Sequence, residues 1–143
     1  MSAYTHLFLH FKVWGELSMY ELTISVDFEA AHRIVDYPGK CNRLHGHNWT
    51  VEVTVAGQKL NNLGMLIDFK ELKAEVNQVI NQFDHIYLNE LEAFQMENPT
   101  AENLARYIYN GLKERPALAA CVIRSVRVWE SPRSAVTYRE GSL

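Results

Sequence analysis

The segment "CNRLHGHNW", residues 41–49, places one thiol and two imidazoles within seven positions. Imidazole and thiolate are common zinc ligands, and both groups also transfer protons in enzymes. An alternating apolar run begins directly afterwards at Trp49. The segment therefore predicts a metal site, a catalytic site, a combination of the two, or a polar turn before a strand.

The two histidines of this segment are spaced for one face of a strand. His45 and His47 lie two positions apart, so their side chains share a face at roughly 7 Å spacing. If the strand of Trp49 extends back through them, both face inward with Trp49. His32, at the end of "FEAAHR", reaches the same face if its own strand pairs with this one as a hairpin. An H-x-H pair alone is also found without metal, but three histidines with an open position are typical of catalytic zinc.

Cys41 has three interpretations. It is a fourth ligand in a closed structural site, a free thiol beside the metal, or a buried loop thiol. A thiol near a dication and several imidazoles has a lowered pKa and can act as base or nucleophile. Cys121, within "LAACVIR", is predicted to be a packing residue on a strand.

The pair Asp84 and His85 lies in "FDHIYLN". One interpretation is a helix C-terminus with a hydrogen-bonded histidine. The other is a Cys–His–Asp relay that is assembled in space rather than along the sequence.

Glu130, in "VRVWESP", shares the parity of Val122, Val126 and Val128 and is expected to face inward. A carboxylate there is costly unless it is paired. Its partner is either an arginine or a ligand with an amidine-like edge, as guanine and pterin have, which binds in a bidentate manner.

The elements that position these residues are predicted from periodicity and caps. Period-2 alternation predicts strands over 20–28, 49–55, 122–130 and 135–139. Helix-capping signals at Asp68 and Thr100 open helical patterns that run to Phe83 and to just before Pro116. This order predicts an α+β domain with a four-stranded antiparallel sheet and two helices on one face.

Composition limits the class of protein. A chain of 143 residues with a net charge of −3 is expected to form one domain, and it lacks the basic clusters of nucleic-acid-binding proteins. No apolar run is long enough to span a membrane. Two cysteines far apart in the sequence argue against a disulfide framework and favour a cytoplasmic protein.

Six motifs in order resemble the 6-pyruvoyl-tetrahydropterin synthase superfamily, and more closely its bacterial queuosine-pathway branch of 6-carboxytetrahydropterin synthases. They are "FEAAHR", "CNRLHGHNW", "GMLIDFKELK", "FDHIYLN", "NPTAENLA" and "VWES", and they cover the chain from about Tyr20 to its end. The three-residue gap between Cys41 and His45 matches the queuosine branch, since the biopterin branch has a longer gap there.

This resemblance implies a tunnelling fold, in which subunit sheets join edge to edge into a barrel. It implies a homo-oligomer, expected to be a hexamer built as a dimer of trimers, with each site completed across a subunit interface. Residues 19–143 then form a single catalytic domain. Residues 1–18 are an N-terminal extension, because family members begin near Met19; it is either an upstream translation artefact or a real appendage.

The resemblance also implies a role for each candidate site residue. Cys41 is the acid/base thiol, and Asp84 with His85 relays its proton. The implied zinc ligands are His32, His45 and His47, and the implied pterin contacts are Glu130, which anchors the amino-pyrimidinone edge, and the region from Thr100 to Glu102.

The implied activity is a zinc-dependent carbon–carbon lyase in queuosine biosynthesis. It converts 7,8-dihydroneopterin triphosphate to 6-carboxy-5,6,7,8-tetrahydropterin and releases acetaldehyde and triphosphate. One alternative is a 6-pyruvoyl-tetrahydropterin synthase, which eliminates triphosphate without breaking the carbon chain. Others are a non-catalytic zinc protein with a closed Cys-His₃ site and a pterin-binding module without turnover.

Overall fold

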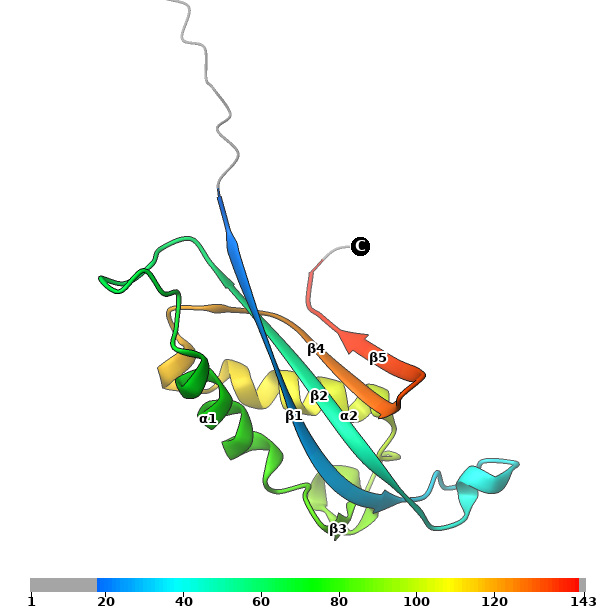
Figure 1. Ribbon diagram of the computed structural model, residues 1–143. Coiled ribbons are helices and arrows are strands. Elements are labelled where there is room, and N and C mark those ends of the chain that lie inside the picture. The colour runs from blue at the N-terminus through cyan, green and yellow to red at the C-terminus, as the bar shows by residue number, and fades with distance from the viewer. Residues whose placement is uncertain (1–17, 142–143) are drawn as a thin grey trace, which may run out of the picture.

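Five strands and two α-helices form the protein, described here by a computed structural model over residues 18–141 (Figure 1). All but the last residue of the expected N-terminal extension 1–18 lies outside the described residues. The strands are β1 (Tyr20–His32), β2 (His45–Gly57), β3 (Ile86–Tyr87), β4 (Val122–Ser131) and β5 (Ser134–Tyr138), and the helices are α1 (Phe69–Ile80) and α2 (Ala101–Lys113). Four single 3₁₀ turns complete the elements: η1 (Lys40–Asn42), η2 (Leu88–Glu90), η3 (Glu92–Phe94) and η4 (Pro116–Leu118).

The long hairpin of β1 and β2 is the centre of the sheet. Its antiparallel register runs without interruption from Tyr20 opposite Gly57 to His32 opposite His45. The predicted alternation is confirmed, because Trp49 and Val51 of β2 are fully buried while Thr50 between them is not. The strand also extends back through the histidine pair, as the parity argument required.

The sheet is mixed, and in this the expectation of four antiparallel strands is wrong. The strand order is β3-β1-β2-β4-β5, and β3 pairs parallel to β1 through Ala30 and Ala31. The remaining neighbours are antiparallel. A two-residue strand carries no alternation, so its sequence has no period from which it can be predicted.

A register shift on β4 changes which residues face inward. Thr54 pairs with Ser125, whereas the next residue of β2 pairs with Ile123, so Arg124 is left over as a bulge. The bulge turns Val122 outward, where it is 63% exposed, against the expectation that it shares the inward face. Glu130 lies beyond the bulge and keeps the parity of the buried Val126.

Both predicted helix caps are present. The Asp68 side chain accepts a hydrogen bond from the Lys70 N–H at 2.7 Å, and Thr100 Oγ1 accepts one from the Asn103 N–H at 3.2 Å. The first helix ends at Ile80, whereas the spacing of apolar residues predicts that it continues to Phe83. Phe83 is buried from the following turn, where its N–H donates to the Ile80 carbonyl at 2.8 Å.

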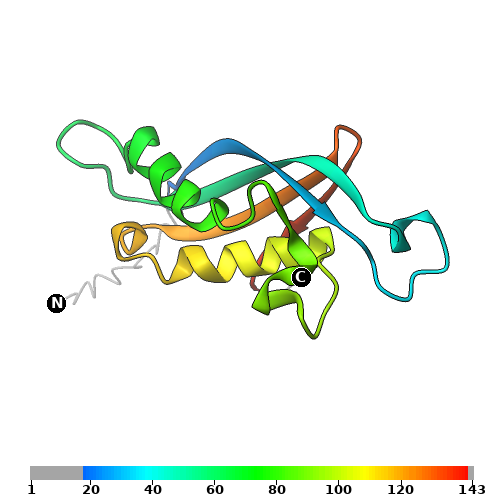
Figure 2. The ribbon, with the colours of Figure 1, turned by 90° about the horizontal axis from the view of Figure 1, so that it is seen from below.

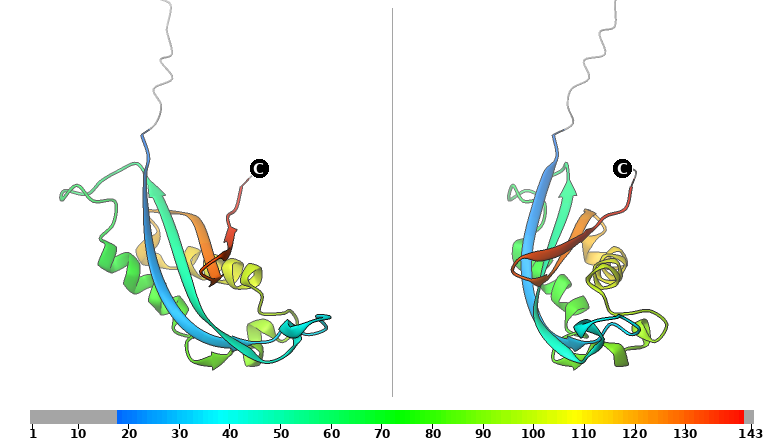
Figure 3. Two further views of the ribbon diagram at one scale, coloured as in Figure 1. Left: turned by 45° about the vertical axis from the view of Figure 1, so that its right-hand side comes forward. Right: turned by 90° about the vertical axis from the view of Figure 1, so that its right-hand side faces the viewer.

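The two helices cover the same face of a twisted sheet (Figures 2 and 3). The core between these layers is closed by large side chains such as Trp49, which stacks on Phe28 with ring centroids 5.8 Å apart. Within residues 18–141 no strand pairs with the outer edge of β1 before Ala30. The described helices include none that is long and apolar enough to cross a membrane.

Phe83 is expected to contribute strongly to the stability of the fold, although it lies outside α1. It is fully buried and contacts the rings of Phe28, Phe94 and Tyr107. Phe83→Ala should lower the free energy of unfolding by about 3–5 kcal/mol, because it leaves a cavity. Phe69→Ala is the matched control, since that ring is 59% exposed and its loss should cost at most about 0.5 kcal/mol. Urea unfolding at one protein concentration measures both, and equal losses would contradict the packing described.

Candidate metal centre and adjoining cleft

Three histidines converge at one end of the β1–β2 hairpin. His32 and His45 are directly opposite each other, and His47 lies opposite Ala30. Side-chain alternation puts all three on the helix-covered face, as predicted. One ring nitrogen from each lies within 4.8 Å of the others, so the three can bind a single ion.

Backbone carbonyls orient two of these rings. His32 Nδ1 lies 2.7 Å from the Pro99 carbonyl oxygen, and His45 Nδ1 lies 2.7 Å from that of Arg43. A carbonyl only accepts, so each Nδ1 carries the proton and each Nε2 keeps its lone pair. This is the usual outer-shell arrangement of a metal-binding histidine.

Two ring nitrogens of the cluster make no hydrogen bond within the described chain. His32 Nε2 and His47 Nε2 are buried and have no hydrogen-bond partner among residues 18–141. Burial lowers the pKa of both imidazoles, against the opposing effects of the Pro99 carbonyl on His32 and of the Glu130 carboxylate on both. Buried, unpartnered Nε2 atoms within one cluster fit a metal ion, and the three-histidine donor set fits zinc with an open position.

Glu130 approaches the same histidines from the end of β4. Its carboxylate oxygens lie 4.0 Å from His32 Nε2 and 3.8 Å from His47 Nε2. No arginine pairs with it among residues 18–141, so the salt-bridge interpretation has no support in the described structure. The side chain is 37% exposed, and the carboxylate is accessible to a bound molecule.

A second polar group forms where β3 meets β1. His85 Nδ1 lies 2.8 Å from the Asp84 carboxylate, and His85 Nε2 lies 3.4 Å from that of Glu29. The backbone locks the pair in place, because Asp84 Oδ1 accepts from the Glu29 N–H at 3.0 Å and the His85 N–H donates to the Glu29 carbonyl at 2.6 Å. His85 has a φ of +56°, in the sparsely populated left-handed region. Helix α1 ends at Ile80, so the pair lies in the turns that follow the helix, and its role in a relay stays a prediction.

The two carboxylates also affect proton binding at His85. The Asp84 hydrogen bond and charge, with a further contribution from Glu29, raise the pKa of the His85 imidazole. Hydrogen bonds from the Glu29 backbone and from His85 lower the pKa of Asp84. Both shifts favour the protonated imidazole beside the ionised carboxylate.

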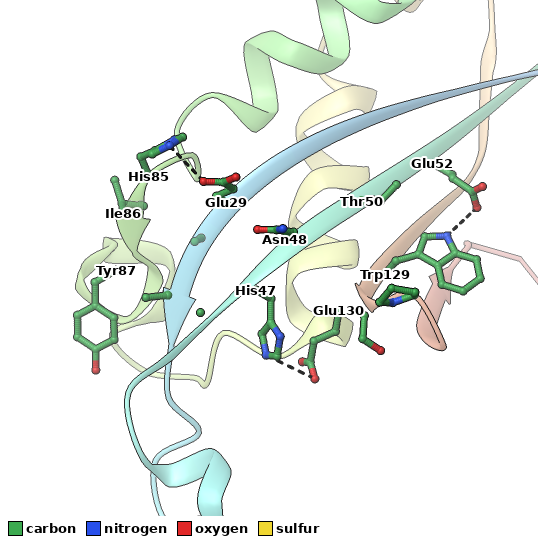
Figure 4. A pocket seen from close by; sticks show the side chains of 15 residues that line it. Glu29, His47, Asn48, Thr50, Glu52, His85, Ile86, Tyr87, Trp129 and Glu130 are labelled. Carbon is green, nitrogen blue, oxygen red and sulfur yellow. Dashed lines mark hydrogen bonds and ion pairs between the residues drawn. The ribbon is translucent and has the colours of Figure 1, made fainter.

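An open cleft of about 1140 Å³ contains parts of both groups (Figure 4). His47 and Glu130 lie in one part of it, and His85 and Glu29 lie in another. Trp129 forms a further wall, with its indole N–H donating to Glu52 at 3.0 Å. The cleft is large enough for a bicyclic ligand with an extended polar chain.

The remaining predicted residues do not line this cleft. Cys41 is exposed in η1, within the loop that joins β1 to β2, and the histidine cluster does not include it. Thr100 caps α2 directly after Pro99, whose carbonyl orients His32, and Glu102 is exposed in the first turn of that helix. Cys121 is half-buried against the core one residue before β4, not on it.

The structure adds two residues that the sequence analysis missed. Glu29 contacts His85, and its position within "FEAAHR" on the face opposite His32 was the available signal. Pro99 acts only through its carbonyl oxygen, so its residue type carries no signal of this role.

Fold and site together define an α+β protein with a three-histidine cluster suited to a metal ion, next to a cleft that contains carboxylates and a second histidine. Residues 21–141 match the family model described as 6-pyruvoyl tetrahydropterin synthase. The chain belongs to this family, as the six ordered motifs indicated.

Individual relatives agree with this assignment. The chain is 44% identical to the putative 6-carboxy-5,6,7,8-tetrahydropterin synthase of Archaeoglobus fulgidus, over 76% of this chain and 85% of that protein. It is 39% identical to the 6-carboxy-5,6,7,8-tetrahydropterin synthase of Synechocystis, over 78% and 86%. Among solved structures, the 6-pyruvoyl tetrahydropterin synthase of Caenorhabditis elegans superposes with a TM-score of 0.76 at 29% identity, covering 87% of this chain and 98% of its own.

Asp84→Asn should lower the pKa of His85 toward the ordinary imidazole value. The substitution removes the charge and the strongest acceptor at Nδ1, so His85 should lose its proton at lower pH than in the unaltered protein. An NMR pH titration of the histidine ring protons measures this, with His85→Gln to assign the signal. An unchanged His85 titration would show that Asp84 does not control this imidazole.

Proposed function

We propose that this protein is a zinc-dependent lyase of queuosine biosynthesis. It converts 7,8-dihydroneopterin triphosphate to 6-carboxy-5,6,7,8-tetrahydropterin, with release of acetaldehyde and triphosphate. The observation that carries the proposal is the convergence of three histidines, two with buried unpartnered nitrogens, beside Glu130 at a cleft that also contains His85. The identity of the relatives that are named for this product supports the choice of reaction.

The ligands of the metal are His32, His45 and His47. When bound, zinc supplies Lewis-acid polarisation of oxygens on the substrate side chain. The chain's own contribution begins with the two backbone carbonyls that fix the rings of His32 and His45, so the ligands are oriented before binding.

Glu130 is proposed to hold the amino-pyrimidinone edge of the pterin through a bidentate, charge-assisted pair of hydrogen bonds. Its carboxylate lies 3.8 and 4.0 Å from two of the histidine nitrogens, so a ring held by Glu130 lies directly beside the metal site. Fixing the ring in this way sets the side chain at the metal and lowers the entropic part of the barrier.

Cys41 is proposed to move protons between carbon and oxygen atoms of the substrate side chain, and His85 is proposed to relay them. Asp84 fixes the tautomer and orientation of His85 through the 2.8 Å contact at Nδ1. Thr100 and Glu102 are proposed to line the substrate pocket of the assembled enzyme.

Two observations support the proposed assembly. Cys41 does not line the cleft of its own chain, which supports a site completed by a second subunit. The outer edge of β1 from Tyr20 to Phe28, which pairs with no strand within residues 18–141, can accept a strand of another copy. We infer a homohexamer, a dimer of trimers whose sheets close into a barrel. Free thiols at Cys41 and Cys121 suit a cytoplasmic location.

The direct test is incubation of the zinc-loaded protein with 7,8-dihydroneopterin triphosphate, followed by mass analysis of the products. Equimolar acetaldehyde and 6-carboxytetrahydropterin are expected. A 6-pyruvoyl product without acetaldehyde would assign the protein to triphosphate elimination instead. No turnover by a zinc-loaded hexamer would favour a non-catalytic binding protein.

Alanine variants of Cys41 and of the three histidines should differ in which property they lose, zinc content or activity alone. His32→Ala, His45→Ala or His47→Ala should each reduce zinc content together with activity, since each removes one of three protein ligands. Cys41→Ala should retain zinc and substrate binding but lose turnover by about 10²–10⁴-fold, the usual cost of losing a general acid–base group.

Zinc per subunit and product formed are measured on the same preparations, with Cys121→Ala as the control thiol. If Cys41→Ala loses zinc as readily as His45→Ala does, the thiol is a ligand and its catalytic role is refuted.

Glu130→Gln should keep the fold and the metal but weaken substrate capture. The lost charge-assisted pair is worth about 1.5–3 kcal/mol, which corresponds to a 10- to 200-fold rise in the dissociation constant. Calorimetric titration of the Cys41→Ala protein, with and without Glu130→Gln, isolates binding from turnover. Equal affinities would remove Glu130 from the pterin site.

A further inference from the structure

The loop that joins β1 to β2, residues 33–44, carries Cys41 but has little regular structure of its own. Its one regular element is η1, and Figure 1 shows the loop projecting from the end of the hairpin. Such a loop needs other contacts if it is to hold a side chain in one place. Those contacts come from two asparagines far away in the sequence.

Asn89, in η2, binds both polar groups of one loop residue. Its Oδ1 accepts from the Arg33 N–H at 2.9 Å, and its Nδ2 donates to the Arg33 carbonyl at 3.0 Å. The side-chain amide thus takes the place of a peptide in a neighbouring strand, which exchanges the same two hydrogen bonds. The Asn89 carbonyl is itself held by Gln95 Nε2 at 3.1 Å.

Asn98 repeats this arrangement two residues further along the loop. Its Oδ1 accepts from the Val35 N–H at 2.8 Å, and its Nδ2 donates to the Val35 carbonyl at 3.2 Å. Asn98 also directly precedes Pro99, the residue whose carbonyl orients His32. Its own carbonyl accepts from Asn103 Nδ2 of α2 at 2.9 Å, so the segment is anchored to a helix.

The residue between these two contacts reaches Cys41. The Ile34 N–H donates to the Cys41 carbonyl at 2.7 Å. The backbone of Cys41 is therefore linked through Ile34 to the asparagine pair, and through Asn98 to the support of His32. Hydrogen bonds, joined by the peptide links between neighbouring residues, connect the backbone of Cys41 with a predicted zinc ligand.

We propose that Asn89 and Asn98 are positioning residues that set the place of Cys41 relative to the histidine cluster. The inference rests on the proposed catalytic role of Cys41. Only an amide side chain offers a donor and an acceptor at the spacing of a peptide group, so aspartate, leucine and alanine cannot reproduce either pair. Neither asparagine contacts the cleft, and both act through the loop backbone.

The test compares Asn98→Ala and Asn89→Ala with the isosteric Asn98→Asp, in the full zinc-loaded protein. Asn110→Ala is the matched control, because that asparagine is exposed on α2. The measurements are zinc per subunit, oligomeric state, kcat and KM separately, and hydrogen exchange of the segment 33–41.

Each alanine variant is expected to lower kcat by about 10- to 100-fold, the cost of misplacing a reacting group by a distance of order 1 Å. Zinc content, oligomeric state and KM should remain near those of the unaltered protein, while exchange rises in 33–41 and nowhere else. Asn98→Asp, which keeps the acceptor for Val35 but loses the donor, should lie between Asn98→Ala and the control.

Unaltered kcat in both alanine variants would overturn the proposal, and so would a loss of activity that follows loss of zinc or of assembly. A fully active Cys41→Ala protein would refute the catalytic thiol instead. In that case the exchange data for 33–41 still show whether the asparagines hold the loop, so the two failures are distinguishable.

Discussion

The register of the β1–β2 hairpin is the constraint on which the rest of the site depends. It puts His32 opposite His45 at the last pair of the ladder, and it gives His47 the same face. A slip of one residue would turn one strand's side chains to the other face of the sheet and separate the histidines. The register is held by the core, because the buried Trp49 and Val51 share the parity of the histidines on the same strand.

Placing the histidines there has a cost in desolvation free energy. Imidazoles at the edge of an apolar core lose water, and two of their nitrogens gain no partner within the described chain. Backbone carbonyls of Pro99 and Arg43 satisfy the opposite sides of two rings. The outer nitrogens of two rings are thus hydrogen-bonded to the backbone, while two inner nitrogens lack a partner. This arrangement is expected where the inner nitrogens bind an ion.

The sequence was sufficient for features that follow from local pattern, and insufficient where partners are distant. Strand parity located the three histidines and Glu130 on one face, and the capping signals at Asp68 and Thr100 were both confirmed. The parallel strand β3 and the outward turn of Val122 were missed, because each depends on pairing with another strand rather than on the residues themselves. The contact of Glu29 with His85 likewise joins two segments that no periodicity relates.

The unpaired outer edge of β1 has a consequence for the folding of a newly made chain. A strand of 13 residues that is paired on that side over only two of them presents peptide groups that must stay in water or find another strand. If a second copy supplies that strand, folding and association become one linked equilibrium, and the midpoint of thermal unfolding rises with protein concentration. Dilution then shifts the equilibrium toward unfolded chains, so the unfolded fraction is larger in a cell that makes few copies of this chain.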